Sequence, residues 1–303
     1  MNLTPMKVAR GVAIGRVLYG AALMSVPKQA MGPAGRDVEG PMVWMGRTLG
    51  VRDLVLGGAT LVALAGEFPT NTPLENLQVT AAHEYFHAVQ YAYDAFEDSW
   101  FLEATAAWAE DELYDGVDDN VQYLNNSPLT APRLPVDRKD GIAVYGSWIF
   151  FRYLTERMPQ QQGGIPTFVR DVLRKADGAA GGLDQYSWQA ISTVLKARKT
   201  SATRMYAAFA AANRRPGQTY SEGAANHYPV APLAGAAKVS RNQQKVGKIA
   251  LKHLSSATVR LTPDAAVQKD PLFAQILLRH TNRNRYDIAR AVPVAGWGAM
   301  AQA

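Results

Sequence analysis

The chain of 303 residues contains no cysteine. This absence excludes a disulfide framework, a zinc or iron–sulfur site with thiolate ligands, and a thiol nucleophile. It leaves the redox compartment open, because a cysteine-free protein can work inside or outside the cell.

Lysine and arginine are absent between Asp53 and Pro132, a stretch that holds 14 of the 26 acidic residues. The net charge of +6 therefore hides an acidic segment inside an otherwise strongly basic chain. Such a segment attracts cations. The basic residues from Arg133 onward are scattered and are not interleaved with aromatic residues, so we expect no nucleic-acid partner.

Long hydrophobic runs are also absent. Residues 17–26 and 54–65 are apolar, but each stretch is far shorter than the roughly 20 residues that cross a bilayer. They predict a pair of buried or interfacial helices, with a partial membrane module as the alternative. No clean small-x-small cleavage site follows the first stretch, which argues against a signal peptide.

The composition, with 48% hydrophobic and 19% charged residues, is typical of a globular protein and not of a disordered one. The length predicts about two domains, and prolines with small polar residues mark a linker at 67–73. We expect an apolar helical segment over 1–66, a mainly helical domain over 74–215, and a β-rich region over 216–303 that is either complete or truncated.

Hydrophobic periodicity gives the expected elements. Residues 115–138 contain three prolines and are expected to form a loop. The fold class is therefore α+β and mainly helical. The expected helices are 74–94, 100–114, 142–157, 185–198 and 202–214, and the expected strands are 256–261 and 273–278.

The chemistry is carried by His83-Glu84-Tyr85-Phe86-His87, an H-E-x-x-H motif. On a helix, residues four apart share a face, so both imidazoles can hold one metal ion. Zinc lowers the pKa of its bound water to about 7, and Glu84 can accept the proton. The neighbours of the motif are largely apolar and predict a buried helix, where histidines without a partner would be costly.

A catalytic zinc needs a third protein ligand and an open position. No third histidine follows at the spacing that a metzincin requires. Glu103 and Glu110 lie seven residues apart on the next expected helix and share a face. Spacing alone does not choose between them.

An H-E-x-x-H followed by a helix of the W-x-x-E-A type, here 100–104, resembles the gluzincins, the group of thermolysin and the one-zinc aminopeptidases. The resemblance implies zincin-like catalytic helices, one zinc ion per chain, and Glu103 as the third ligand. Glu110 then accepts a hydrogen bond from a ligand imidazole or simply lies on the surface.

Residues 145–154 are similar to a tyrosine-led helix in aminopeptidase-like gluzincins. This similarity implies that the Tyr145 hydroxyl stabilises the oxyanion of the reaction. The alternative is that Tyr145 is a core aromatic residue. Because thermolysin-like enzymes use a late histidine, His227 is the alternative donor.

Two further resemblances concern location. Residues 78–262 look like a set of bacterial secreted metalloproteases known from sequence, which implies a secreted or cell-envelope protein. Residues 47–57 resemble a motif in small bacterial membrane proteins with a few helices. Membrane association through 1–66 is therefore an expectation, with a fused or mis-joined segment as the alternative.

The sequence thus predicts a zinc-dependent peptidase that acts on a peptide or protein substrate. The acidic turn at 115–120 is a candidate Ca²⁺ site without EF-hand spacing, and a solvated turn is the alternative. The alternative functions are a catalytically inactive zinc-binding scaffold and a membrane-associated interaction protein. Glu84 favours the enzyme, because a scaffold has no need of a base beside its metal.

Overall fold

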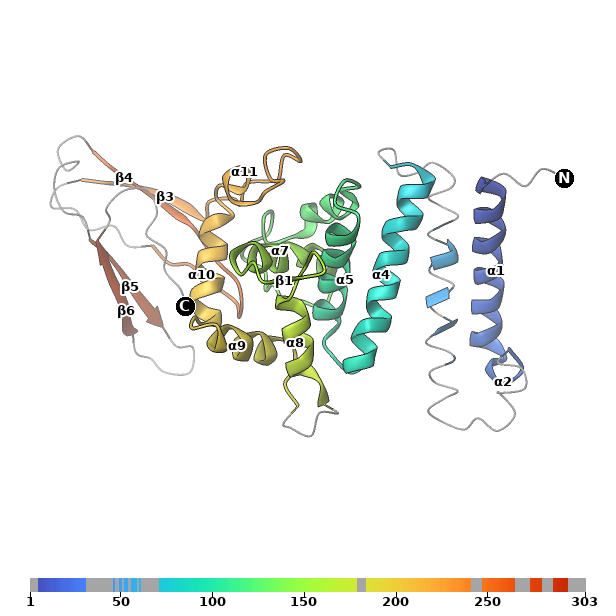
Figure 1. Ribbon diagram of the computed structural model, residues 1–303. Coiled ribbons are helices and arrows are strands. Elements are labelled where there is room, and N and C mark those ends of the chain that lie inside the picture. The colour runs from blue at the N-terminus through green and yellow to red at the C-terminus, as the bar shows by residue number, and fades with distance from the viewer. Residues whose placement is uncertain are drawn as a thin grey trace. The chain divides into compact units, whose positions relative to one another are not determined.

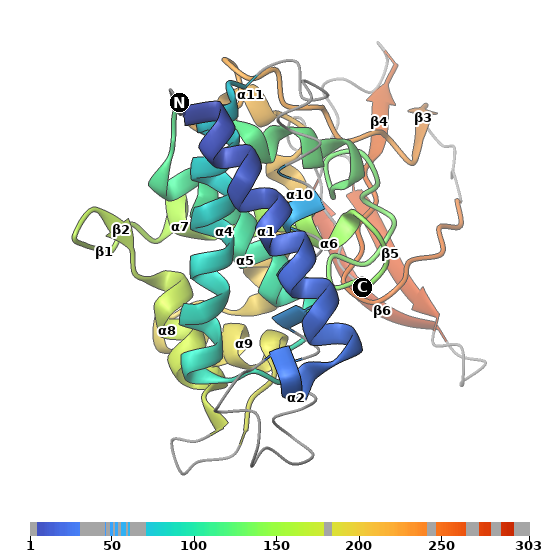
Figure 2. The same ribbon diagram turned by 90° about the vertical axis from the view of Figure 1, so that its right-hand side faces the viewer.

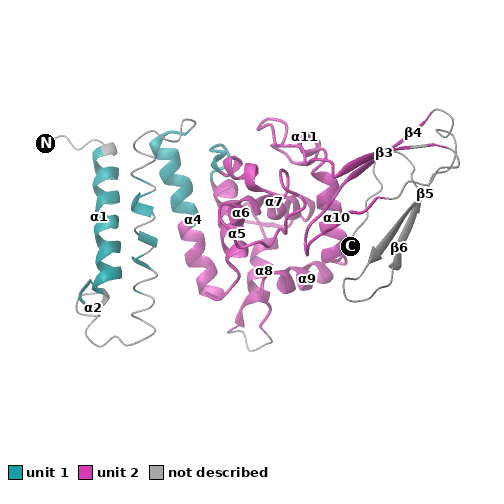
Figure 3. Cartoon of the chain, turned by 180° about the vertical axis from the view of Figure 1, so that it is seen from behind, with its two compact units in different colours: residues 1–83, 114–119 teal, residues 84–113, 120–303 magenta. Residues whose placement is uncertain are grey.

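The computed structural model describes residues 5–30, 71–178, 184–240, 247–264, 273–279 and 286–293, together with 46, 49–50, 52–53, 56–58 and 60. The chain forms two compact units, 1–83 with 114–119 and 84–113 with 120–303 (Figure 3). The division falls inside one continuous helix, α4 (Pro73–Tyr93). The predicted boundaries at 66 and 215 stay predictions, and residues 67–70 of the predicted linker lie outside the described residues.

Unit 1 contains helix α1 (Pro5–Ser25) and the short helix α2 (Pro27–Ala30). A Cβ at Gly57 would lie 2.6 Å from the Ala13 carbonyl oxygen, so this glycine permits a close backbone approach to α1. Arg16 and Asp53 form an ion pair at 3.1 Å. None of the described helices combines the length and the hydropathy that a membrane crossing requires.

Unit 2 is built around helix α5 (Ser99–Leu113), which lies between the second half of α4 and helix α7 (Trp148–Arg157) (Figure 1). Trp100, Phe101 and Trp108 of α5 are almost completely buried. The core continues through Phe150, whose ring contacts Phe209 with centroids 5.1 Å apart. The remaining helices of this unit are α6 (Ala143–Gly146), α8 (Phe168–Ala176), α9 (Ser187–Ala197), α10 (Ala202–Ala212) and α11 (Pro216–Thr219).

Strands form three two-stranded sheets in the described residues. Strands β1 (Gln161–Gln162) and β2 (Ile165–Pro166) make the hairpin that projects between α7 and α8 in Figure 2. Further along the chain, β3 (Gly235–Val239) pairs in parallel with β4 (Val259–Pro263). Strand β5 (Phe273–Arg279) pairs antiparallel with β6 (Tyr286–Pro293). The prediction of a mainly helical α+β chain is confirmed.

The element predictions differ from the structure at several places, and helix α11 and strands β1, β2, β3 and β6 were not predicted. The expected helix 142–157 is interrupted at Ser147, whose hydroxyl donates to the Val136 carbonyl at 2.6 Å. The expected loop 115–138 contains a 3₁₀ helix, η2 (Asp119–Asn126). Helix α8 was not predicted, although it carries a buried apolar face.

Candidate metal centre

Helix α4 begins with a capping box. The Thr72 side-chain oxygen accepts from the Glu75 backbone N–H at 3.3 Å, and the Glu75 carboxylate accepts from the Thr72 N–H at 2.6 Å. This reciprocal pair satisfies two N–H groups that the helix leaves unbonded. The capped helix then runs without a break through the H-E-x-x-H motif.

The two histidines of the motif lie on the buried face of α4. His83 is 8% exposed and His87 is 6% exposed, whereas Tyr85 is 70% exposed. The helix is thus buried on one face and not all round, which corrects the expectation of a largely buried helix. Because α4 is continuous, its geometry fixes the spacing of the two imidazoles at one turn.

Glu103 of α5 faces His87. The distance between Glu103 Oε2 and His87 Nε2 is 3.5 Å. His83, His87 and Glu103 each offer one ligand atom, and these atoms lie within 4.8 Å of one another. Two ligands of a tetrahedral zinc, each about 2.05 Å from the metal, are about 3.3 Å apart. The His87–Glu103 distance therefore fits a shared zinc ion.

Gln90 is hydrogen-bonded to the His87 ring nitrogen that faces away from Glu103. The sequence analysis did not identify Gln90 as a site residue. The Gln90 Oε1 atom lies 2.7 Å from His87 Nδ1. Its amide nitrogen donates to the Leu102 carbonyl at 2.8 Å and to Thr105 Oγ1 at 2.7 Å. Gln90 thus accepts from His87 Nδ1–H, which leaves Nε2 as the ring nitrogen available to a metal. The available signal was a glutamine three residues after His87, on the buried side of the same helix.

Tyr145 of α6 lies beside the candidate metal ligand Glu103. Its hydroxyl is hydrogen-bonded to Glu103. Burial first, and then the negative charges of Glu103, Glu84 and Glu110, raise the pKa of Tyr145 well above its ordinary value. The ring stacks on Tyr123 of η2 with centroids 5.1 Å apart. Tyr145 is therefore a protonated donor at the ligands and also packs beside the core.

The other two predicted residues lie in different surroundings. Glu110 is 4% exposed on α5, and its charge reaches Tyr145, so it is not a surface residue. His227 is exposed, with a left-handed backbone at φ 49°. In the described part of the chain, no hydrogen bond, ion pair or ring contact joins His227 to the ligand group or to Tyr145.

The acidic turn at 115–120 is partly anchored within unit 1. Asp119 Oδ1 accepts a hydrogen bond from Asn71 Nδ2 at 3.0 Å. Asp118 adopts a left-handed backbone at φ 55°, a conformation that aspartate tolerates in turns. Calcium binding by this turn stays a prediction.

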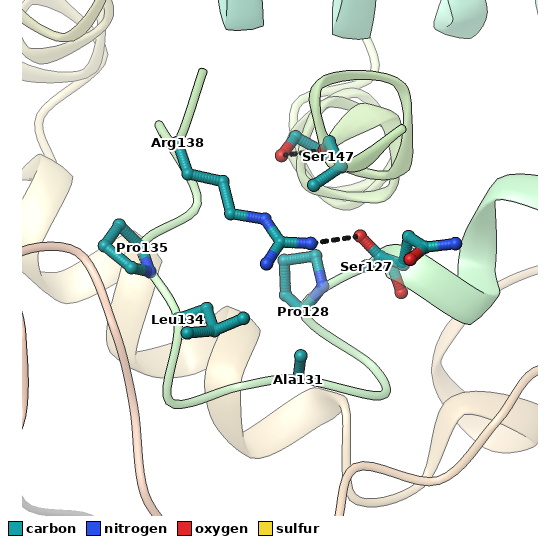
Figure 4. Close-up of a pocket in the computed structure, with 9 residues that line it drawn as sticks. Ser127, Pro128, Ala131, Leu134, Pro135, Arg138 and Ser147 are labelled. Atoms are coloured by element: carbon teal, nitrogen blue, oxygen red, sulfur yellow. Dashed lines mark hydrogen bonds between the residues drawn. The ribbon is translucent and has the colours of Figure 1, made fainter. Parts of the chain in front are cut away.

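A small hollow lies between the loop 126–138 and the helical turn at Ala143 and Ser147 (Figure 4). Arg138 Nη2 donates across it to the Asn126 carbonyl at 3.3 Å. None of the predicted ligands lines this hollow, so it carries no part of the proposed chemistry.

Comparisons of the chain with protein-family models, with curated proteins and with solved structures gave no match. The resemblance to gluzincins therefore stays a prediction. The side chains of α4, α5 and α6 carry the chemistry from which a function can be inferred.

Proposed function

We propose that this protein is a zinc-dependent peptidase whose metal is held by His83, His87 and Glu103. The proposal rests above all on one observation. The Glu103 carboxylate approaches Nε2 of His87, while Gln90 engages the opposite ring nitrogen. The contact of Gln90 with His87 Nδ1 orients the imidazole as second-layer partners of metal ligands do. Polar side chains that are adjacent by chance have no need of such an orienting partner.

The donor set supports zinc over the hard cations. Two imidazole nitrogens and one carboxylate oxygen suit zinc, whereas calcium and magnesium prefer oxygen ligands throughout. Three protein ligands leave the fourth position of a tetrahedral ion open, as catalysis requires.

Held by His83, His87 and Glu103, a zinc ion would lower the pKa of a bound water to about 7 and polarise a carbonyl group. Glu84, beside His83 on α4, accepts the proton from the attacking water and later delivers it to the leaving amine. The Tyr145 hydroxyl donates a hydrogen bond to the oxygen that gains negative charge at the scissile carbonyl. The ordinary pKa of a phenol already keeps that proton in place at neutral pH, and the surroundings of Tyr145 raise its pKa further.

Peptide bonds are the proposed substrate because this combination of a general base and a phenol donor suits the hydrolysis of an amide. The resemblance to secreted metalloproteases supports a secreted or cell-envelope location. Membrane association through residues 1–66 rests on sequence resemblance alone and awaits a detergent-free purification.

Metal content is the first test. We expect elemental mass spectrometry to find about one zinc per wild-type chain and none in His83→Ala. If the wild type binds no zinc even after zinc is added, the proposed centre is wrong.

Turnover is the second test. Glu84→Gln should lower kcat on a cleaved library peptide by about 10²- to 10⁴-fold, with zinc content unchanged. Wild-type activity in Glu84→Gln would contradict the assigned base. A zinc-loaded wild type that cleaves no peptide would favour the inactive scaffold.

A further inference from the structure

A second group of carboxylates lies in unit 2, at the turn that joins α4 to α5. Asp94 follows the last residue of α4, Glu97 lies in the turn, and Asp184 precedes α9. Each offers one oxygen atom, and the three atoms lie within 4.8 Å of one another. No local sequence pattern indicates this group, because Asp184 is far from the other two residues along the chain.

Glu97 is the buried member of the group. It is 8% exposed. Its Oε2 atom accepts hydrogen bonds from the Ser187 backbone N–H and hydroxyl, both at 2.8 Å. The other oxygen, Oε1, is enclosed, and no donor among the described residues reaches it. A buried carboxylate oxygen without a partner is costly, so this atom points to a bound cation.

No lysine or arginine in the described residues forms an ion pair with Asp94, Glu97 or Asp184. The nearby Asp98 shows the contrast, because it pairs with Lys139. Burial raises the pKa of Glu97; hydrogen bonds from Ser187 oppose the shift, and the charges of Asp94 and Asp98 add to it.

The exposed side chain of Tyr186 is subject to the negative charge of the same three carboxylates. Its pKa is raised by a hydrogen bond to Asp184 and by the charges of Asp184, Asp94 and Glu97. Gly178 adjoins the group as well, since a Cβ there would lie 3.1 Å from Asp94 Oδ2 and 3.5 Å from Asp184 Cγ. The absent side chain leaves room beside both carboxylates.

We propose that Asp94, Glu97 and Asp184 bind one calcium ion. Calcium takes six to eight oxygen ligands at about 2.3–2.6 Å, so opposite ligands lie about 5 Å apart. The spacing of the three oxygens falls within this limit. An all-oxygen set disfavours zinc, and backbone carbonyls and water supply the ligands that calcium still needs.

The ion would tie the α4–α5 turn to the segment that enters α9. That turn joins the helix of His87 to the helix of Glu103, so calcium would restrain the two helices that carry the zinc ligands. The calcium site does not depend on the proposed peptidase activity, because its binding is measured without a substrate.

Calorimetric titration of the purified full chain with calcium chloride tests the proposal. We expect one Ca²⁺ per chain, and at least about 10-fold weaker binding in Asp184→Asn, which removes a charged ligand. Asp184 is exposed, so this variant should fold. At a calcium concentration of about 100 times Kd, the wild-type Tm should rise by about 5–10 °C.

Asp140→Asn is the matched control, since Asp140 is an exposed aspartate of the same unit, and it should bind calcium as the wild type does. Glu97→Gln should lose calcium binding without a lower Tm in calcium-free buffer, because it removes a buried charge while keeping an acceptor for Ser187. A lower Tm there would indicate a purely structural carboxylate.

Three results would overturn the site. The first is a wild type that binds no calcium, and the second is an Asp184→Asn variant that binds calcium as tightly as the wild type. The third is loss of binding in Asp118→Asn but not in Asp184→Asn, which would place the ion at the acidic turn 115–120.

Discussion

Helix α5 carries acidic side chains at two places, and their partners differ. Near the start of the helix, Glu103 faces the imidazole of His87 and the hydroxyl of Tyr145. Near its end, Asp111 and Glu112 face the guanidinium of Arg152 at 2.7 Å and 3.4 Å. Both places are largely screened from water, so each carboxylate needs compensation.

Arg152 also reaches Glu156 at 3.0 Å and Glu222 at 2.9 Å. Burial alone would lower the pKa of Arg152, but the charges of Asp111, Glu222, Glu112 and Glu156 raise it above its ordinary value. Arg152 is therefore a cation, and it compensates part of the negative charge of these four carboxylates. Glu103 instead lies beside His87 and Tyr145, which are its partners in the proposed metal centre.

The comparison predicts that substitution of Glu103 lowers the affinity for zinc, whereas substitution of Arg152 lowers the free energy of unfolding. Glu103→Gln should weaken zinc binding by more than about 100-fold, beyond the 10- to 100-fold effect of residues that support ligands. Competition with a chromophoric chelator measures this change. The control is Glu112→Gln on the same helix, which should keep its zinc; equal zinc affinity in both variants would remove the distinction.

Arg152→Met should lower the free energy of unfolding by about 3–5 kcal/mol, because it leaves buried carboxylates without their cation. Urea denaturation at pH 7 measures the loss, and the folded fraction should keep its zinc. Arg157→Met is the control. Arg157 is exposed, and its contact with the Tyr153 ring at 5.4 Å is worth about 1 kcal/mol or less. A loss as large as that of Arg152→Met would contradict the assignment.

Tyr145→Phe separates a catalytic role of the Tyr145 hydroxyl from packing of its ring, because it deletes the hydroxyl and keeps the ring. If the hydroxyl serves the oxyanion, kcat should fall by about 10²- to 10³-fold while zinc content and Tm stay close to wild type. Tyr123→Phe keeps the stacked ring and should leave kcat unchanged. A small effect of Tyr145→Phe would indicate that this residue only packs.

Gln90→Leu should weaken zinc binding by about 10- to 100-fold, since the imidazole of His87 loses its orienting partner. Gln90→Glu keeps an acceptor for His87 and should recover part of the affinity. Both variants lose the hydrogen bonds to α5. A role limited to packing therefore predicts equal zinc affinities for the two variants.

The sequence predicted the parts of the site that depend on local spacing. Four residues of separation were enough to put His83 and His87 on one face, and apolar periodicity gave α4 and α5 to within about one residue. The choice between Glu103 and Glu110 needed the packing of the two helices, because residues seven apart share a face. Only the structure brings Glu103 to His87.

Other features depend on contacts between distant segments. The interruption at Ser147 follows from its hydrogen bond to Val136 and from the close packing of Gly146, where a Cβ would lie 2.7 Å from the Asn126 carbonyl oxygen. The group of Asp94, Glu97 and Asp184 likewise needed the fold. No local pattern distinguishes such residues from surface aspartates and glutamates.

The hydrogen bonds of Gln90 have a consequence for which substitutions the centre can tolerate. The Leu102 carbonyl can only accept, so the Gln90 amide nitrogen must face it and the amide oxygen must face His87. His87 therefore carries its proton on Nδ1 and presents the lone pair of Nε2. The first acceptor in this series of hydrogen bonds is the Leu102 backbone carbonyl of α5. Every amino acid at position 102 would provide the same carbonyl. Mutation of Leu102 can thus change the packing, but it cannot delete the group that sets the tautomer of His87.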